Sequence, residues 1–234
     1  MSAGRTNKSG PIRVGILGQG RSGLDIHARW LEKSPRKYKI VAVADLLTER
    51  RQRAEKEFGC DTYRQIDDLL ARDDLDLVVN SLPSYLHPPA TIAALKAGHN
   101  VVCEKPAAWN TAQLDKMIEA AGKARRVLAP FQQSRYRALF RKTLDVIDSG
   151  CLGRIVQVRI TANGFARRWD WQTVQEYKGG NLLNTGPHFV DWAVCLQGFK
   201  KPDEILCAMD RANTYGDAED YVKVVLKKKG APLI

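Results

Sequence analysis

The sequence predicts an α/β protein with an N-terminal Rossmann domain, a doubly wound parallel sheet, followed by an incomplete α+β domain with an open mixed sheet. Between Ile12 and Gln133, short apolar runs alternate with helical segments. Such alternation is typical of a parallel sheet covered by helices on both faces. After Gln133, strands follow one another with fewer helices between them, which favours an α+β arrangement.

In the first part, a strand is expected wherever a short apolar run lies between polar or glycine residues. These runs are 12–17, 40–44, 76–82, 100–103 and 127–131, with a weaker one at 61–63. Helices are expected between them at 24–32, 48–58, 67–72, 88–97 and 111–124. Pro88 and Pro89 suit a helix start, Gly98 suits its left-handed end, and Thr111 is the expected N-cap of the last helix.

The second part begins with a helix at 135–149 that Gly150 closes. Residues 154–161 alternate polar and apolar side chains as a strand does. The segment 169–180 is irregular and carries paired tryptophans. The remaining expected elements are a helix at about 187–196 and strands at 204–209 and 221–226.

These patterns divide the chain into a disordered tail at 1–10, a dinucleotide-binding domain at 11–133 and a substrate and oligomerisation domain at 134–234. The last domain is thin, so it buries little apolar area to offset the entropy of ordering it. We therefore expect the sequence to be truncated at its C-terminus, and to aggregate because open strand edges are uncovered.

The composition is that of an ordinary globular protein, with 44% hydrophobic and 27% charged residues. The net charge of +11 comes from scattered basic residues, which favours a solvated surface over a nucleic-acid partner. No apolar run is long enough for a membrane span, and no signal peptide is evident. The five cysteines show no metal spacing, so we expect buried, reduced thiols, no metal and a cytoplasmic protein.

A glycine motif follows the first expected strand and opens the first expected helix. In Gly18-Gln19-Gly20-Arg21-Ser22-Gly23, the first glycine permits a tight turn, the second lets the backbone approach phosphates and the third allows close helix packing. The helix start offers unpaired N–H groups to an anion. The motif predicts the pyrophosphate site of a dinucleotide.

Asp45 ends the second expected strand, 22 positions after Gly23. A carboxylate there can accept the ribose hydroxyls of NAD and repels the 2′-phosphate of NADP. We expect NAD, while NADP stays possible because Arg50 and Arg51 are close enough to bind a phosphate. The alternative is that Asp45 only caps the segment that follows.

Two further segments end strands at the same edge of the sheet. Backbone from Ser81 through Leu82 and Pro83 to Ser84 is expected to line the cofactor, because ligands bind beyond the carboxyl ends of such strands. His87 lies one residue before the next helix and reads equally well as a cofactor contact or as a surface or capping residue. Glu104 and Lys105 end the following strand and are expected to contact the cofactor. The Lys105 ammonium could also stabilise a developing alkoxide.

A third cluster lies in the second part. Asn184, His188 and Asp191 fall at i, i+4 and i+7, so they point in similar directions if the segment is helical. His188 suits a general base, because an unshifted histidine titrates near pH 6.5. The alternative is a capping Asn and a core His. Trp169, with Trp171 and Arg167 or Arg168, could line a sugar pocket, or the tryptophans could be buried structural residues.

In this order, the motifs resemble those of the Gfo/Idh/MocA oxidoreductase family, which includes glucose–fructose oxidoreductase and inositol dehydrogenase. The matching segments are GxGxxG at Gly18–Gly23, VAVAD at Val41–Asp45, the Pro83 to His87 segment, AGHNVVCEKP at Ala97–Pro106, Arg135-Tyr136 with Ser149–Gly153, and GGNLLNTGPHFVD at Gly179–Asp191. The resemblance implies a Rossmann domain, a mixed-sheet domain that forms the substrate floor and oligomer contact, and a cis Lys105–Pro106 peptide.

The resemblance also implies Lys105 and His188 as catalytic groups. Many members have Asp where this chain has Asn184, which cannot take a proton. Members are also usually longer by roughly a hundred residues. The expected function is hydride transfer between nicotinamide and a secondary alcohol of a sugar, cyclitol or related polyol, with substrate contacts from Lys105, Trp169, Asn184, His188 and Asp191. The full-length protein is expected to be a homo-oligomer. The alternatives are a non-catalytic NAD(P)-binding sensor and an NAD-dependent glycoside hydrolase.

Overall fold

The structure is a computed structural model that describes residues 10–165 and 167–234. The chain divides into two compact units, with the boundary between Phe131 and Gln132. The expected disordered tail lies outside the described residues, except for Gly10.

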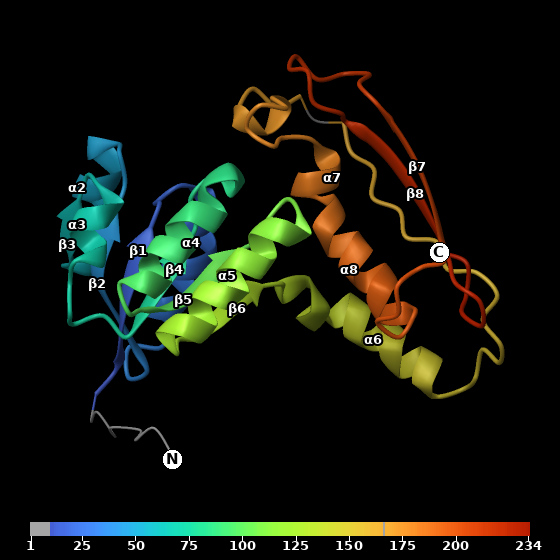
Figure 1. The fold of residues 1–234 in the computed structure, drawn as a ribbon, viewed down its shortest axis with the longest axis horizontal. Helices are drawn as coiled ribbons and strands as arrows, with labels where there is room; N and C mark the ends of the chain where they lie inside the picture. Colours follow the sequence, from blue (N-terminus) through green and yellow to red (C-terminus); the bar gives the residue numbers. More distant parts are fainter. Residues whose placement is uncertain (1–9, 166) are drawn as a thin grey trace. The chain divides into compact units, whose positions relative to one another are not determined.

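The first unit is built on a six-stranded sheet in which every neighbouring pair of strands is parallel (Figure 1). Its strands are β1 (Ile12–Leu17), β2 (Tyr38–Ala44), β3 (Asp61–Tyr63), β4 (Leu77–Asn80), β5 (Asn100–Glu104) and β6 (Leu128–Phe131). Their order across the sheet is β3-β2-β1-β4-β5-β6. This is the strand order of a dinucleotide-binding Rossmann fold, with the topological switch between β1 and β4. The predicted fold class is confirmed.

Two apolar cores cover the two faces of this sheet. The helices are the π-helical η1 (Ser22–Ala28), α1 (Arg29–Glu32), α2 (Thr48–Phe58), α3 (Ile66–Leu70), α4 (His87–Lys96) and α5 (Thr111–Ala124), with a 3-10 turn η2 (Ser84–Leu86). One core joins sheet residues such as Leu17 and Val78 to α3, α4 and α5. The other joins Val14, Ile16 and Val79 to η1, α1 and α2. Because the strands β1, β2 and β4 are buried on both faces over most of their length, each reads in the sequence as a continuous apolar run.

Two local details in this unit differ from the expectation. The helix expected at 24–32 is present, but its first turns after the glycine motif are π-helical and only Arg29–Glu32 is α. Hydrophobic spacing over so short a stretch does not separate these two helix types. The N-cap of α5 is Asn110 and not Thr111, because Asn110 has extended backbone and its Oδ1 accepts from the N–H of Gln113 at 2.9 Å.

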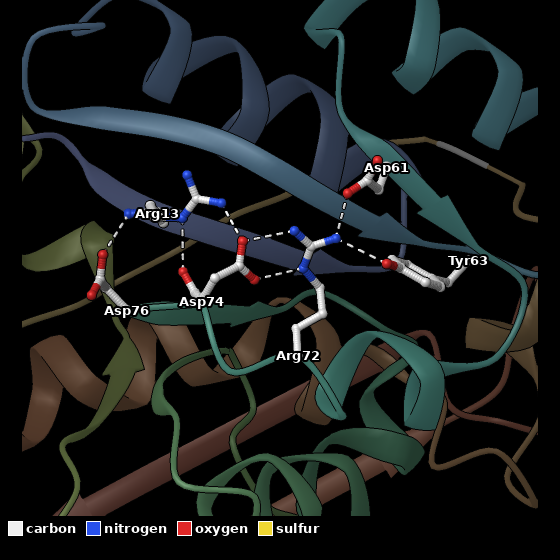
Figure 2. Close-up of polar contacts among 6 residues, drawn as sticks. All are labelled: Arg13, Asp61, Tyr63, Arg72, Asp74 and Asp76. Atoms are coloured by element: carbon white, nitrogen blue, oxygen red, sulfur yellow. Dashed lines mark hydrogen bonds and ion pairs between the residues drawn. The ribbon is translucent and has the colours of Figure 1, made fainter.

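A polar network holds the amino ends of three strands together (Figure 2). The guanidinium of Arg72 donates two bonds of 2.8 Å to the carboxylate of Asp74. It also donates to Tyr63 Oη at 2.9 Å and pairs with Asp61. Arg13 pairs with Asp74 and donates from Nε to its carbonyl at 2.9 Å. The segment before β4 is thereby fastened to β1 and β3.

The second unit contains helices and one pair of strands (Figure 1). Its elements are η3 (Gln133–Tyr136), α6 (Ala138–Asp148), η4 (Trp171–Thr173), α7 (Asn181–Asn184), α8 (Gly186–Leu196), β7 (Glu204–Asp210) and β8 (Tyr221–Lys227). The strands β7 and β8 pair antiparallel in register from Glu204–Lys227 to Asp210–Tyr221. The indole of Trp192 on α8 stacks on Phe140 of α6, with ring centroids 4.7 Å apart, so α6 and α8 share an apolar contact.

The predicted strand at 154–161 is wrong. Its alternating side chains adopt irregular backbone, and among the described residues it has one bridge, between Gln157 and Leu233. A single bridge cannot hold a strand, because pairing along its whole length is what stabilises it. The helix expected at 135–149 starts only at Ala138, because Arg137 is extended. The turn before it is anchored by the indole N–H of Trp192, which donates to Ser134 O at 3.1 Å.

The cysteines only partly match the expectation of burial. Cys60 and Cys103 are buried, whereas Cys151 and Cys207 are exposed, and all five are free thiols. Burial raises the pKa of the Cys60 thiol to about 11. Within the described residues, no cluster of side chains that could ligate a metal is found. None of the helices in that part of the chain is long and apolar enough to cross a membrane.

Candidate functional site

The carboxyl ends of β1, β4 and β5 are neighbours in the sheet, so the segments that follow them meet at one edge. These segments begin at Gly18, Ser81 and Lys105. In doubly wound sheets, ligands bind in the crevice outside these strand ends, at the switch point. The structure therefore brings three of the sequence-predicted segments to one place.

The glycine motif forms a cradle that side chains would fill. Gly18 has φ +85°, which glycine adopts readily, and a Cβ there would lie 3.0 Å from Ser81 O. A Cβ on Gly23 would lie 2.0 Å from Gly18 O, which only the absence of a side chain allows. A Cβ on Gly20 would come no closer than 3.5 Å to a described atom, Arg50 Nη1. The loop therefore fits a pyrophosphate that approaches the backbone at Gly20 before the start of η1.

The other predicted members of this motif are placed differently. Gln19 is 1% exposed, its N–H donates to Asp45 Oδ2 at 2.7 Å and its carbonyl accepts from Arg53 Nη2 at 2.8 Å. Its backbone is thus used within the protein. Arg21 is exposed and Ser22 half-buried at the start of η1, where both are accessible to a phosphate.

Asp45 joins the glycine loop to the end of β2. Its carboxylate is buried and accepts from the N–H of Gln19, and its Oδ1 accepts from the N–H of Leu47 at 2.9 Å. The N-cap of α2 is Leu47, without a side-chain cap, so Asp45 binds the residue before the helix. Arg50 Nη1 lies 3.4 Å from Asp45 Oδ2. A cation therefore stands beside the carboxylate at the predicted ribose position.

The segment after β4 is fastened to the glycine loop. The Ser81 hydroxyl lies 2.8 Å from the carbonyl oxygens of both Leu17 and Gly18, and it has one proton to share between them. Leu82 and Pro83 follow, both half-buried. Ser81 thus acts on the loop's geometry through its side chain.

His87 lies inside the protein as the first residue of α4, not one residue before it, and no side chain caps this helix, so the alternative of a surface or capping residue is wrong. It is 2% exposed, with Nδ1 2.7 Å from Pro106 O and Nε2 2.8 Å from Leu82 O. Both partners only accept, so a neutral ring can donate to one of them at a time. Burial lowers the pKa of His87 and so favours that neutral ring.

The side chain of Glu104 is buried and contacts the backbone of Lys105. Its Oε1 lies 3.0 Å from Nε2 of His27, both side chains being buried. Its Oε2 accepts from the N–H of Lys105 at 3.1 Å. Although burial opposes ionisation, the bond from His27 holds the pKa of Glu104 below its usual value. The Lys105–Pro106 peptide bond is cis, as the resemblance implies.

His27 is a functional candidate that the sequence reasoning missed. It lies on η1, 6% exposed, and its ring meets that of Phe131 at 4.6 Å. A lone histidine on the buried face of a helix indicates no function by itself. Its contact with Glu104, 77 residues further along the chain, is what makes His27 a candidate.

In the second unit, Asn184 and His188 lie on consecutive helices. Asn184 ends α7, and His188 lies in the first turn of α8 with its N–H donating to Thr185 O at 3.2 Å. Gln172 Nε2 donates to Asn184 Oδ1 at 3.1 Å. Both site side chains are half-buried, so they reach the surface of this unit.

The start of α7 depends on a glycine and an acidic residue. Gly180 has φ +101°, and a Cβ there would lie 2.0 Å from Glu219 Oε2. Glu219 Oε1 accepts from the N–H of Leu182 at 2.8 Å, and its carbonyl accepts from Asn181 at 3.0 Å. The segment that carries Asn184 is therefore held by the residues just before β8.

The other two predicted substrate residues, Asp191 and Trp169, both contact side chains of the protein. Asp191 accepts two bonds from Arg135, at 2.8 and 2.6 Å. Trp169 is 79% exposed, and its ring stacks on Tyr215 at 4.7 Å. The alternative of a buried structural role for Trp169 is therefore wrong.

Two family models match the chain. The model of the oxidoreductase family with an NAD-binding Rossmann fold matches residues 12–131. The model of the GFO/IDH/MocA C-terminal domain matches residues 140–233. The first match confirms the predicted cofactor class, because it is the model of an NAD-binding fold.

Two curated relatives share just over a quarter of their aligned residues with this chain. An uncharacterized oxidoreductase of Schizosaccharomyces pombe is 28% identical over 92% of this chain and 60% of its own length. Myo-inositol 2-dehydrogenase of Thermotoga maritima is 28% identical over 94% of this chain and 66% of its own length. The chain thus spans about three fifths of the curated relatives it matches.

Among solved structures, the WlbA dehydrogenase of Bordetella pertussis superposes with a TM-score of 0.85 and 27% identity. The superposition covers 96% of this chain and 65% of that one. That protein was crystallised with NADH and UDP-GlcNAcA.

Proposed function

Since the chain belongs to the Gfo/Idh/MocA family of oxidoreductases, we propose that it transfers hydride between NAD and a secondary alcohol of a sugar, cyclitol or related polyol. The observation that carries this proposal is the meeting of the glycine cradle, Asp45 and Lys105 at one sheet edge. The names of the relatives support the substrate class, since one is a myo-inositol 2-dehydrogenase and another was crystallised with a nucleotide sugar.

The cofactor is held by the first unit. The backbone at Gly20 and at the start of η1 receives the pyrophosphate, and Asp45 accepts hydrogen bonds from the hydroxyls of the adenosine ribose. Ser81, Leu82 and Pro83 line the dinucleotide between its pyrophosphate and Lys105. When bound, NAD supplies the acceptor for the hydride.

The protein's own groups handle the proton and the charge. Lys105 donates a hydrogen bond to the substrate oxygen and stabilises the negative charge that develops there. His188 accepts the hydroxyl proton, a role that suits an imidazole near neutral pH. Asn184 cannot take a proton, so it orients the substrate by hydrogen bonds alone.

The test is a spectrophotometric screen of the purified chain at the NADH absorbance band. NAD and NADP are each offered with myo-inositol, free aldoses and nucleotide sugars. Turnover with one of these alcohols supports the proposal. Cofactor binding without turnover on the whole set points to a sensor, and aglycone release without net NADH to a glycoside hydrolase; either result overturns it.

Single substitutions test the two roles. Lys105→Met and His188→Gln are expected to lower kcat about 100-fold or more, while the Kd for NADH, measured by fluorescence, stays unchanged. Lys96→Met and His99→Gln are matched controls, because they make the same chemical changes at positions outside the proposed site. Wild-type turnover in either site variant removes that residue from the mechanism.

A further inference from the structure

The reaction proposed above needs the Lys105 ammonium in one place, and the inference drawn next rests on that proposed function. We propose that two buried histidines, His27 and His87, are positioning residues for Lys105. They fix the backbone on either side of the Lys105–Pro106 peptide bond, one through Glu104 and one directly.

The first support is the contact between His27, on η1, and Glu104. A carboxylate can only accept, so in the 3.0 Å contact Nε2 of His27 donates to Glu104 Oε1. Phe131 packs against His27, since the two ring centroids are 4.6 Å apart. The imidazole therefore orients the carboxylate from η1, the helix that starts at the pyrophosphate cradle.

The oriented carboxylate then holds the lysine. Glu104 Oε1 is taken by His27, which leaves Oε2 to accept from the Lys105 N–H at 3.1 Å. Glu104 is 4% exposed, so water does not compete for this bond. A change at His27 is therefore transmitted to the Lys105 backbone through one side chain.

The second support lies on the other side of the peptide. His87 Nδ1 is 2.7 Å from the carbonyl oxygen of Pro106, and its Nε2 is 2.8 Å from that of Leu82. The ring thereby lies between the segment after β4 and the segment after β5. Both segments belong to the edge where the cofactor is proposed to bind.

Positioning of this kind matters because a lysine side chain is long and flexible. A displacement of about 1 Å at a reacting group can cost about 100-fold in rate. Bonds to the N–H of Lys105 and to the carbonyl of Pro106 restrict the motion of the backbone that carries the lysine side chain.

The chain provides a control for these two histidines. His99 is also buried, 3% exposed, and its Nε2 lies 2.9 Å from the carbonyl oxygen of Leu70. It precedes β5, whereas Lys105 follows it. His99 thus matches them in burial and bonding but lies at the opposite edge of the sheet.

The experiment compares His27→Leu, His87→Leu and His99→Leu in the full 234-residue chain. Hydrogen exchange of a peptide spanning residues 100–109 reports the freedom of the Lys105 backbone. NADH fluorescence gives the cofactor Kd, and turnover gives kcat and KM. If His27→Leu does not fold because it leaves the buried Glu104 Oε1 without its partner, the double variant His27→Leu/Glu104→Leu removes that carboxylate as well.

We expect exchange in residues 100–109 to be about tenfold faster in the His27 and His87 variants and unchanged by His99→Leu. kcat is expected to fall about tenfold or more, with the NADH Kd within twofold of wild type. His87→Gln, which keeps one donor, is expected to restore most of kcat. A role in stability alone would lower the melting temperature of all three variants alike and leave kcat of the folded enzyme unchanged.

The exchange result decides the inference without reference to turnover. Equal exchange in all three leucine variants overturns it. If exchange changes as expected while Lys105→Met keeps wild-type turnover, the histidines hold the lysine and the catalytic role proposed for Lys105 is what fails.

Discussion

The carboxylate of Asp45 accepts a hydrogen bond from the backbone N–H of Gln19, with 2.7 Å between Oδ2 and N. This bond joins the end of β2 to the glycine loop across 26 residues of sequence. Asp45 therefore has two functions, one in the shape of the loop and one, as proposed, toward the adenosine ribose. Both depend on its charge.

Replacing Asp45 with Ser is expected to weaken NADH binding by about 10- to 100-fold, the cost of losing a charge-assisted hydrogen bond of about 1.5–3 kcal/mol. NADPH is expected to bind more tightly than to wild type, because Arg50, 3.4 Å from the carboxylate, then faces the 2′-phosphate without a competing anion. Fluorescence titrations with both coenzymes measure this. Asp68→Ser removes the same charge at an exposed position and serves as the control. An unchanged preference for NADH over NADPH in Asp45→Ser contradicts the assignment.

Replacing Gly23 with Ala is expected to abolish NADH binding. The new methyl group would lie 2.0 Å from Gly18 O, so the loop must move to accept it. Gly122 is the matched position, since it is exposed in α5 and its Cβ meets nothing within 4 Å. Gly122→Ala is expected to bind NADH normally and to gain about 0.5–1 kcal/mol of stability. Normal binding by Gly23→Ala would show that the loop is not the pyrophosphate site.

The cap of α5 can be tested by two adjacent substitutions. Asn110→Ala is expected to lower the free energy of unfolding by about 1 kcal/mol, because the N–H of Gln113 loses its acceptor. Thr111→Ala is expected to change it by less than about 0.5 kcal/mol. Urea unfolding of both variants gives the comparison. A larger loss in Thr111→Ala would restore the assignment expected from the sequence.

Acid is expected to weaken the network of Figure 2. The bond from Arg72, with a further one from Arg13, holds the pKa of Asp74 well below its ordinary value of 3.8. A depressed carboxylate pKa stabilises the fold above the unfolded value, and this contribution is lost as pH falls below about 3.8. Asp74→Asn is expected to have a smaller difference in urea midpoint between pH 7 and pH 3 than wild type or Asp73→Asn. An equal difference in all three would locate the acid sensitivity elsewhere.

The pair of Arg135 and Asp191 separates a structural role from substrate binding. If Asp191 acts only through its two bonds to Arg135, Asp191→Asn and Arg135→Gln should lower the melting temperature by similar amounts and change KM alike. If Asp191 also contacts substrate, its substitution raises KM more than that of Arg135. Thermal unfolding and steady-state kinetics with the alcohol found in the screen distinguish these results.

Local chemistry made much of the fold predictable from the sequence. The bounds of β1, α2 and α5 match the expected ranges, because buried parallel strands are continuous apolar runs and helices repeat their apolar positions with a fixed period. The glycine motif was equally readable, since Gly18 and Gly23 meet steric demands that other residues cannot meet. The NAD-binding fold follows from these local signals taken in order.

The sequence alone could not give the contacts between distant side chains. His27 and Glu104 are 77 residues apart, and Arg135 and Asp191 are 56 apart. Whether such residues meet depends on how the elements pack, which no local pattern records. The same reason explains the failed strand at 154–161, since an alternating segment becomes a strand only where a partner lies beside it. The sequence by itself determined the Rossmann fold and its cofactor class, and the tertiary structure decided which side chains hold Lys105 in place.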